Sequence, residues 1–342
     1  MKRCIKNLFC LLSILLSLTA CQPATPSLQL SGATMGTRYH ITVVAYPSSF
    51  DTKQVQNSID QLLEKINQQM STYQNDAEIS RFNRYRGNDW FPISNEFLYV
   101  ISQAKKAYQV SHAAFDPSIY PLVNLWGFAQ SSPIIPPSDQ LINHALQHIG
   151  LQHLNIQTTP AALAKDDILL SLDLSAIAKG YAVDQVSALL SRYGLHNHLV
   201  EIGGEIHAQG NNSQQQAWHI AVEHPANLQQ PHAPITGLYL HNQSLATSGN
   251  YRNFFEYQGK RYAHTLDPKT GKPTQHSLIS VTVVHPSSLW ADAMATAIMV
   301  MGAEKGLAFA NQQKLAVFMV TSKDGKHYQS QANRLFNTYT QE

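Results

Sequence analysis

Two oxygen-bearing side chains interrupt an apolar helical segment near the C-terminal end of the chain. Asp292 and Thr296 are four residues apart among Ala, Met, Ile and Val, so a helix places both on one face. Hard oxygen ligands of this kind suit Mg²⁺. A structural role is open as well, because Asp292 would favour the helix N-terminal dipole and Thr296 can hydrogen bond to the carbonyl four residues earlier. By residue type and spacing, the pair is a candidate metal site.

A second polar segment, Asp173–Gly180, is predicted to join the end of a strand to the start of a helix. Free backbone N–H groups and the helix dipole at such a start attract phosphate, and Lys179 adds a positive charge. We therefore expect that a diphosphate could bind here. The alternative is that Asp173 and Ser175 cap the helix and that Gly180 only permits close packing. The segment is not a Walker loop, and no Gly-x-Gly-x-x-Gly motif follows a strand.

Two further segments are rich in small residues. Glu201–Glu205 ends a predicted strand with Gly203 and Gly204, which lets a ligand approach the backbone. A bulge or a tight turn would explain the glycines equally well. Ala246–Asn250 is expected to be a similar loop.

His264 is the candidate general base. It is predicted to stand at a strand end, ahead of an Asp-Pro turn, and an imidazole is suited to taking a proton from a hydroxyl. The chain contains 16 histidines, so residue type alone is a weak argument. No His-Glu-x-x-His, Gly-x-Ser-x-Gly or Cys/His arrangement competes with it.

The spacing of apolar residues predicts the elements that must position these side chains. Helical spacing predicts helices over Val55–Met70, Asn95–Tyr108, Ser138–Gly150, Ala182–Leu190 and Ser288–Met301. Asn95 is an expected N-cap, and Gly194 closes the fourth helix. Strands are expected over Tyr39–Tyr46, near Leu154, and over Ile168–Leu172, Leu199–Ile202, Trp218–Val222, Leu238–Leu240, Phe254–Tyr257, Arg261–Thr265 and Ile279–Val284, with a last pair around Lys323–Lys326. The class is mixed α/β or α+β.

Composition excludes several classes of protein. The chain has 342 residues and is 44% hydrophobic, enough for a large core, and no internal linker or repeat divides it. Its formal charge is +2, but Lys2, Arg3 and Lys6 belong to a removable segment. Without them 21 basic side chains face 22 acidic ones, a net charge of −1. No basic field remains for nucleic acid.

The N-terminus reads as an export signal. Residues 1–20 combine basic residues with the apolar run Leu8–Leu18, which is too short to span a bilayer. The run ends at Cys21 in a sequence that resembles a bacterial lipobox, so we expect a lipidated Cys21 and a tether through residue 30. Gln22 mildly favours the outer over the inner membrane, with the protein facing the periplasm. The alternative is an ordinary signal peptide.

Cysteine usage agrees with export. The three cysteines are Cys4, Cys10 and Cys21, and the first two leave with the signal. The mature body therefore has no thiol for catalysis, disulfides or cysteine-ligated metal.

Taken together, these segments resemble the ApbE family of FAD:protein FMN transferases from about Gly32 to Gly302. The blocks that carry the resemblance are Gly32–Thr37, Ser71–Tyr73 with Ser80–Asn83, Ala114–Asp116 with Pro121–Phe128, Asp173–Gly180, Glu201–Glu205, His264–Gly271 and Ala291–Ala297. Seven blocks in the family's order form a specific match.

The resemblance implies a fold and an activity. The fold would be a single α+β body over residues 31–335, related to the T-fold, with mixed sheets flanked by helices. The enzyme would split FAD and place FMN, through a phosphoester, on a Thr or Ser hydroxyl of another protein. Acceptors in the family are flavoprotein subunits such as those of NADH:quinone reductases.

The resemblance also implies site residues, position by position. The residues that would contact FAD are Met35, Tyr73, Ala114, Phe115, Asp116, Asp173, Lys179 and Leu266. Those that would hold Mg²⁺ are the Ala176 carbonyl, Asp292 and Thr296. His264 would take the acceptor proton. Some relatives have a carboxylate where this chain has Ala295, so its metal shell would be thinner or completed by water.

Three other functions stay open. The same site could hydrolyse FAD to FMN and AMP, with water in place of the protein hydroxyl. The chain could instead bind flavin without reaction, or be a structural lipoprotein without a ligand.

Overall fold

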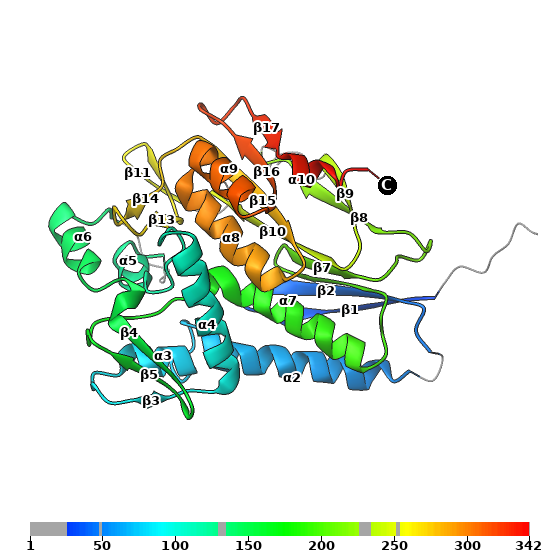
Figure 1. Ribbon diagram of the computed structural model, residues 1–342, viewed down its shortest axis with the longest axis horizontal. Coiled ribbons are helices and arrows are strands. Elements are labelled where there is room, and N and C mark those ends of the chain that lie inside the picture. The colour runs from blue at the N-terminus through cyan, green and yellow to red at the C-terminus, as the bar shows by residue number, and fades with distance from the viewer. Residues whose placement is uncertain (1–25, 48–49, 129–134, 226–233, 251–253, 342) are drawn as a thin grey trace, which may run out of the picture.

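The computed structural model of the chain describes residues 26–47, 50–128, 135–225, 234–250 and 254–341 (Figure 1). The expected signal peptide, Cys21 and Gln22 lie outside these residues. Within the described ranges, no helix combines the length and the apolar character needed to cross a bilayer.

The helices follow the apolar spacing of the sequence. Their bounds are α2 Thr52–Met70, α3 Glu78–Arg84, α4 Asn95–Val110, α5 Tyr120–Leu125, α6 Asp139–Leu146, α7 Ser175–Arg192, α8 Ser288–Met301, α9 Ala303–Gln312 and α10 Arg334–Asn337, with a 3₁₀ turn at Leu151–His153. The prediction of a helix over Ser288–Met301 is confirmed at both ends.

The strands form one large sheet and several small ones. Their bounds are β1 Ser27–Thr34, β2 Thr37–Val44, β3 Phe91–Pro92, β4 Leu154–Thr158, β5 Ala161–Lys165, β6 His198–Ile202, β7 Glu205–Gln209, β8 Trp218–Glu223, β9 Pro234–Leu240, β10 Gln243–Gly249, β11 Phe254–Tyr257, β12 Lys260–Ala263, β13 Leu266–Asp267, β14 Lys272–Pro273, β15 Leu278–His285, β16 Ala316–Thr321 and β17 Gln329–Ala332.

The large sheet has eight strands in the order β1-β2-β6-β7-β10-β15-β16-β17. Every pairing between these strands is antiparallel. Antiparallel pairing distinguishes an α+β fold from an α/β fold with parallel strands, so it decides between the two classes that the sequence left open. Outside this sheet, an isolated bridge between Ile119 and Ser171 is parallel.

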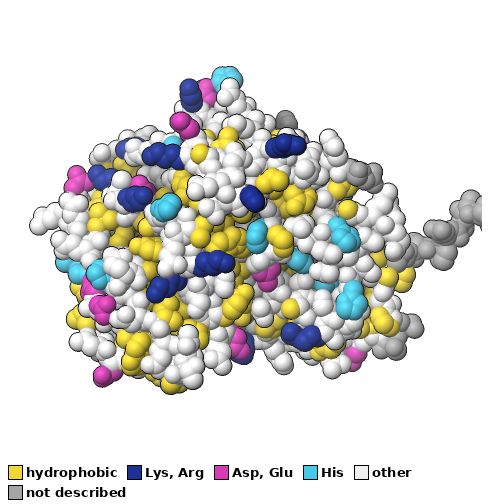
Figure 2. Space-filling view, in the orientation of Figure 1, with side chains coloured by type: hydrophobic (Ala, Val, Ile, Leu, Met, Phe, Trp, Pro, Cys, Tyr) yellow, Lys and Arg dark blue, Asp and Glu magenta, His cyan; other side chains and the backbone are white. Residues whose placement is uncertain are grey.

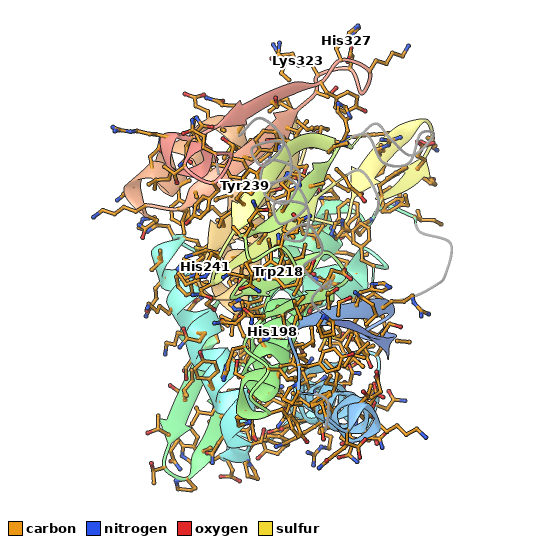
Figure 3. All side chains as sticks on the ribbon, turned by 90° about the vertical axis from the view of Figure 1, so that its right-hand side faces the viewer. His198, Trp218, Tyr239, His241, Lys323 and His327 are labelled. Atoms are coloured by element: carbon orange, nitrogen blue, oxygen red, sulfur yellow. The ribbon has the colours of Figure 1, made fainter. Side chains whose placement is uncertain are left out.

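The two faces of the sheet are covered differently. Helices α2, α7, α8 and α9 pack on one face, and the β8–β9 hairpin with α10 packs on the other (Figures 1 and 3). Strand β16 alternates between the two cores, since Val317 and Met319 pack with the helices while Phe318 and Val320 pack with the hairpin. Figure 3 labels Trp218 of the hairpin and His198 of β6.

Strand β2 is fixed in register and tied to α2. Tyr39 lies opposite Gly32 of β1 and Ile202 of β6. A Cβ atom at Gly32 would be 2.6 Å from the Tyr39 ring, so only glycine leaves room for that ring. The Tyr39 hydroxyl donates to Asp60 Oδ1 at 2.5 Å, which connects the sheet to α2.

Helices α7 and α8 pack closely at their N-terminal turns. A Cβ atom at Gly180 would be 2.3 Å from the Ser288 carbonyl oxygen, so glycine is required for the approach. Asp184, one turn further along α7, accepts hydrogen bonds from the backbone N–H groups of Ser288 and Leu289 at 2.8 and 3.1 Å. The carboxylate of one helix therefore caps the N-terminus of the other.

Two predictions from the sequence, one of a helix cap and one of a strand, are wrong. The N-cap of α4 is Ser94, whose hydroxyl accepts from the Phe97 N–H at 3.2 Å, and Asn95 is already helical. Ile168–Leu172 is not a strand, because Asp167 accepts the Leu169 N–H at 2.9 Å and closes a turn there.

Two other segments are strands where the sequence indicated loops. Ala246–Asn250, expected as a loop, contributes most of its residues to β10, where Thr247 hydrogen bonds to Thr282 of β15 at 2.9 Å. Its small side chains lie under α8. Strand β1 begins at Ser27, inside the segment assigned to the tether.

Charged side chains are spread over the surface. Figure 2 shows lysines and arginines separated by uncharged and acidic side chains on the visible face, without a continuous basic patch there.

Candidate active site

One large cavity gathers the predicted site residues. Its volume is about 1310 Å³, larger than the roughly 300 to 1,000 Å³ of ordinary small-molecule pockets. Every predicted FAD, metal and proton-transfer residue lines it: Met35, Tyr73, Ala114, Phe115, Asp116, Asp173, Ala176, Lys179, His264, Leu266, Asp292 and Thr296. The structure thus brings together residues up to 261 positions apart, while their individual roles stay predictions.

A tight hairpin presents Met35 to the cavity. Met35 and Gly36 join β1 to β2 with φ values of 50° and 69°. Positive φ at both positions is typical of the type I′ turn, which matches the twist of the strands. The left-handed conformation costs a non-glycine residue about 1 kcal/mol, and here it holds Met35 at the cavity.

The Ala114–Asp116 segment is held by a similarly tight loop. His112 and Ala113 follow α4 with φ values of 52° and 64°. Asp116 is buried, and its Oδ1 accepts the Ser118 N–H at 2.8 Å. Burial raises the pKa of Asp116, although Ser118 opposes this effect. The carboxyl group therefore organises its own loop in addition to lining the cavity.

Asp173 has both of the roles that the sequence left open. Its Oδ1 accepts the Ser175 N–H at 2.8 Å in the first turn of α7, as a capping residue does. It also lines the cavity, as does Tyr73, a residue that is 76% exposed. Burial raises the pKa of Asp173.

A buried charge cluster forms the polar centre of the cavity. Lys179 Nζ of α7 lies 3.2 Å from Glu205 Oε1 of β7 and 4.0 Å from Asp292 Oδ2 of α8. The side chains of the two acids are only 4% and 5% exposed. Burial raises the pKa of both carboxyl groups, and Lys179 partly offsets this. Burial alone would lower the pKa of Lys179, but the two acids outweigh it and raise that pKa.

The cluster suits an additional cation. Two buried carboxyl groups face one ammonium group, and Glu205 Oε2 has no hydrogen-bond partner. Buried charges that lack compensation are costly. A divalent cation or a further donor at this position would reduce that cost.

The predicted metal ligands lie next to the cluster. Asp292 Oδ2 accepts the Gly180 N–H at 3.0 Å. In a regular α-helix this N–H is directed at the carbonyl oxygen of Ala176, so the carboxylate reaches the turn that carries that carbonyl. Thr296 Oγ1 lies 3.3 Å from Ser248 Oγ of β10. The donor set consists of hard oxygens and fits Mg²⁺.

This set differs from a site built of acids and histidines. Among the described residues, no group of three or more His, Cys, Asp or Glu side chains is arranged to hold a metal ion. The predicted shell instead combines one carboxylate, one hydroxyl and one backbone carbonyl, which leaves positions for substrate oxygens or water.

His264 and Leu266 reach the cavity from the β12–β14 region. Asp267 closes the following turn by accepting the Lys269 N–H at 2.9 Å through its side chain and the Gly271 N–H at 2.8 Å through its carbonyl. Leu266 is buried against the α5–α6 core. The Asp-Pro turn predicted from the sequence is therefore present and joins β13 to β14.

Sequence reasoning gave no role to two residues of this site. Glu205 closed a recognised block, but nothing in its type showed that it pairs with Lys179. Ser248 lay in a small-residue segment that was expected to be a loop. One feature could have indicated a role for Glu205: it is an acidic residue in a buried strand, and an acid at such a position requires a partner.

The model of the ApbE family matches residues 35–319. The chain belongs to the ApbE family. The match extends beyond the region from Gly32 to Gly302 that the sequence blocks indicated, toward the end of β16.

Relatives and solved structures agree with this assignment. The FAD:protein FMN transferase of Vibrio cholerae is 40% identical over 334 residues, covering 97% of this chain and 99% of the relative. That of Haemophilus influenzae is 38% identical, covering 95% and 94%. The flavin transferase ApbE structure from Vibrio cholerae superposes with a TM-score of 0.84 at 38% identity, covering 92% and 99%. The Pseudomonas stutzeri flavinyl transferase ApbE, in its apo form, gives 0.84 at 34% identity, covering 92% and 97%.

Proposed function

We propose that this protein transfers FMN from FAD to a Thr or Ser hydroxyl of a periplasmic flavoprotein subunit, releases AMP and requires Mg²⁺. The observation that carries the proposal is that every residue expected to take part lines one large cavity. Membership of the ApbE family makes the chain a transferase that acts on flavin. The metal, the acceptor residue and the compartment are the proposed parts.

The diphosphate of FAD would bind between α7 and α8. Lys179 projects a positive charge into the cavity, and the N-terminal turn of α7 adds the positive end of a helix dipole. Tyr73, largely exposed at the cavity, offers an aromatic face to a planar ring. The cavity therefore matches both the charged centre and the aromatic ends of a dinucleotide.

The Ala176 carbonyl, Asp292 and Thr296 would hold Mg²⁺ beside the diphosphate. A bound Mg²⁺ would neutralise charge on the bridging phosphate oxygens. Asp292 is fixed for this task by its hydrogen bond from the Gly180 N–H.

The transfer step would need little covalent chemistry from the enzyme. The acceptor hydroxyl oxygen attacks the phosphorus on the riboflavin side, a new P–O bond forms, and the P–O bond to adenylate breaks in line. His264 takes the hydroxyl proton, and AMP leaves with the bridging oxygen. Lys179 stabilises the charge that develops on the phosphate oxygens.

The export signal expected at the N-terminus supports a location of this reaction in the cell envelope. Lipidation at Cys21 would anchor the chain to a membrane, facing the periplasm, with Gln22 mildly favouring the outer membrane. Acceptors would be flavoprotein subunits of the NADH:quinone reductase type, exposed in the same compartment.

Hydrolysis of FAD and simple flavin binding are the competing functions. The full-length protein, mixed with FAD, Mg²⁺ and a candidate acceptor, separates the three. Flavin fluorescence that stays on the acceptor band through a denaturing gel supports transfer. Free FMN without a labelled acceptor indicates hydrolysis, and unchanged FAD indicates binding. Either of the last two results contradicts the proposal for that acceptor, and a panel of acceptor subunits that all stay unlabelled contradicts it altogether.

A further inference from the structure

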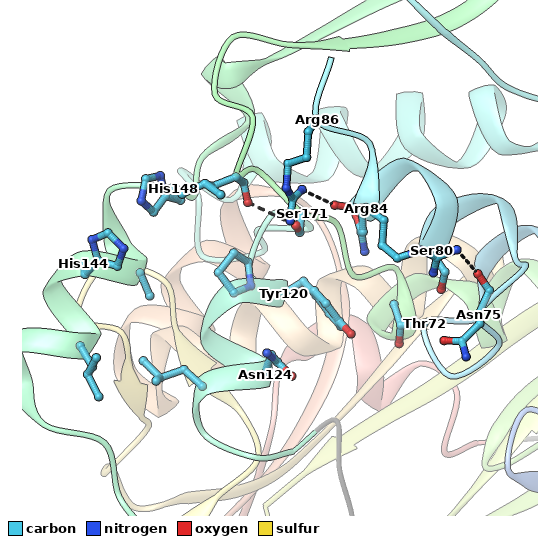
Figure 4. A pocket seen from close by; sticks show the side chains of 16 residues that line it. Thr72, Asn75, Ser80, Arg84, Arg86, Tyr120, Asn124, His144, His148 and Ser171 are labelled. Carbon is cyan, nitrogen blue, oxygen red and sulfur yellow. Dashed lines mark hydrogen bonds between the residues drawn. The ribbon is translucent and has the colours of Figure 1, made fainter. Parts of the chain in front are cut away.

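A second cavity of about 520 Å³ lies beside the first, and Thr72 lines both. Its wall consists of the loop after α2, the end of α3, and parts of α5 and α6 (Figure 4). None of the residues expected to bind FAD or Mg²⁺ lines this second cavity. Apart from Thr72, the second cavity is therefore lined by different residues from the first.

Basic side chains line the second cavity. Arg84, Arg86, His144 and His148 line it, and none of the described lining residues is an Asp or Glu. No carboxylate of the described residues forms an ion pair with either arginine. A concave site lined by one sign of charge attracts the opposite sign.

Both guanidinium groups are held in place by backbone carbonyls. Arg84 Nη2 donates to the Asn75 carbonyl at 2.5 Å, and Arg86 Nη1 donates to those of Asn83 and Ile168 at 2.8 and 3.1 Å. These carbonyls carry no net charge, so they orient the arginines without neutralising them. An arginine has five N–H donors, so each keeps others for an oxyanion.

His148 adds a buried donor or acceptor that lacks a partner. Its Nδ1 lies 2.6 Å from Asp167 Oδ2, while its Nε2 is buried and makes no hydrogen bond. Burial alone would raise the pKa of Asp167, but hydrogen bonds from His148 and Leu169 outweigh it and lower that pKa. The hydrogen bond between His148 Nδ1 and this carboxylate fixes the ring and leaves Nε2 for a ligand.

The remaining wall is apolar and suits a flat ring. Pro121, Leu125, Leu141 and Leu169 line the cavity, and Leu141 is 52% exposed although it is hydrophobic. Figure 4 shows Tyr120 between the arginine side and the histidine side. One part of the cavity thus carries positively charged side chains, and the other carries an apolar surface on which a planar ring can stack.

We propose that the second cavity binds a nucleoside monophosphate, with the phosphate on Arg84 and Arg86 and the planar base against the apolar wall. AMP and FMN share this chemistry. The choice of AMP as the natural ligand rests on the proposed function, which releases AMP in the neighbouring cavity. The site would hold the product as it leaves.

Titration of the full-length protein in detergent with AMP tests this proposal. The large cavity is first saturated with FAD in buffer containing EDTA, so that no reaction occurs. We expect one AMP to bind to the FAD-saturated protein, and adenosine, which lacks the phosphate, to bind at least tenfold more weakly. A parallel titration with FMN identifies which monophosphate the site prefers.

Variants assign the binding to this cavity. Arg84→Gln should weaken AMP binding at least tenfold and leave FAD affinity unchanged. Arg81→Gln removes a positive charge from the same helix, lines neither cavity and should change AMP affinity less than twofold. Leu141→Glu, at an exposed lining position, should weaken AMP binding by charge repulsion.

AMP binding that disappears when FAD is bound would overturn the proposal, as would equal effects of Arg84→Gln and Arg81→Gln. A failure of the proposed function looks different: wild-type protein would not bind FAD or would not label an acceptor. In that case the effect of Arg84→Gln on AMP binding still tests the second cavity.

Discussion

At the scale of single residues, the charge cluster of Lys179, Glu205 and Asp292 determines what the large cavity can bind. A single ammonium group compensates two buried carboxyl groups, so the cluster attracts a further cation. Lys179 in turn is kept charged by the two acids. In the proposed function, the same three residues would prepare the cavity for both a metal and a diphosphate.

Replacement of Glu205 tests its contribution to the charge of the cluster. Glu205→Gln keeps the size of the side chain and removes a carboxyl group that can ionise beside Asp292. We expect the Mg²⁺ concentration for half-maximal FAD binding to rise at least tenfold, about 1.4 kcal/mol. Quenching of flavin fluorescence at increasing Mg²⁺ measures this concentration. Glu256→Gln, at an exposed position on β11, is the control; an equal effect of both variants would remove the role assigned to Glu205.

The pH dependence of transfer tests His264. A general base must be unprotonated, so the rate should rise with pH and then level off. His264→Asn should lower kcat by about 10² to 10⁴ and abolish this rise. His327→Asn, at the exposed β16–β17 turn, should behave as wild type. A pH–rate profile unchanged in His264→Asn would assign the proton to another acceptor.

At the scale of elements, the α7–α8 pair positions the site. Gly180 allows the two helices to touch, and its N–H holds Asp292. Asp184 joins the same two helices one turn away. A ligand site shared between two helices therefore depends on one close backbone contact.

Gly180→Ala should disturb both stability and binding. The added methyl group would lie 2.3 Å from the Ser288 carbonyl oxygen, so the helices must separate. We expect a loss of about 1 to 3 kcal/mol in the free energy of unfolding, together with weaker Mg²⁺-dependent FAD binding. Ala188→Ser, on the exposed side of α7, should cost less than about 0.5 kcal/mol in the same denaturant titration. Equal stability of the two variants would contradict the packing argument.

Helices were easier to predict than turns and short strands. Apolar spacing predicted α2 and α8 well because burial of one face determines both the period and the length of a helix. Ile168–Leu172 has the apolar content of a strand, but the local hydrogen bonds of Asp167 make it a turn. In β10, a run of small residues looks like a loop in the sequence. The residues are small because α8 packs directly on them.

At the scale of the whole molecule, the sheet assembles the site from distant parts of the chain. Motif blocks predicted which residues belong to the site, and all of them line one cavity. The contacts between blocks were not predictable, because periodicity describes each segment alone. The pairing of Lys179 with Glu205 arises only when β7 and α7 pack together.

Global stability should fall in acid because of His198. This side chain is fully buried between Ser187 and the Leu195 carbonyl. Burial is the main cause that lowers the pKa of His198 to about 4. The native state therefore binds fewer protons than the unfolded state below about pH 7, and stability present at higher pH is lost as the pH falls through 6.5 toward 4.

The expected size of this loss is about 3 kcal/mol between pH 7.5 and 4. Denaturant unfolding at a series of pH values measures it. His198→Gln should lower stability at pH 7.5 but flatten the dependence on pH, whereas His327→Asn should retain the wild-type slope. A wild-type slope in His198→Gln would show that other groups cause the acid sensitivity.

FAD affinity in the presence and absence of Mg²⁺ is the most direct test of the whole account. Flavin fluorescence of the full-length protein gives both dissociation constants. We predict that Mg²⁺ tightens FAD binding at least tenfold in the wild type, that Asp292→Ala removes this gain, and that Lys179→Met weakens binding with or without the metal. Undetectable FAD binding under both conditions would contradict the assignment of the cavity.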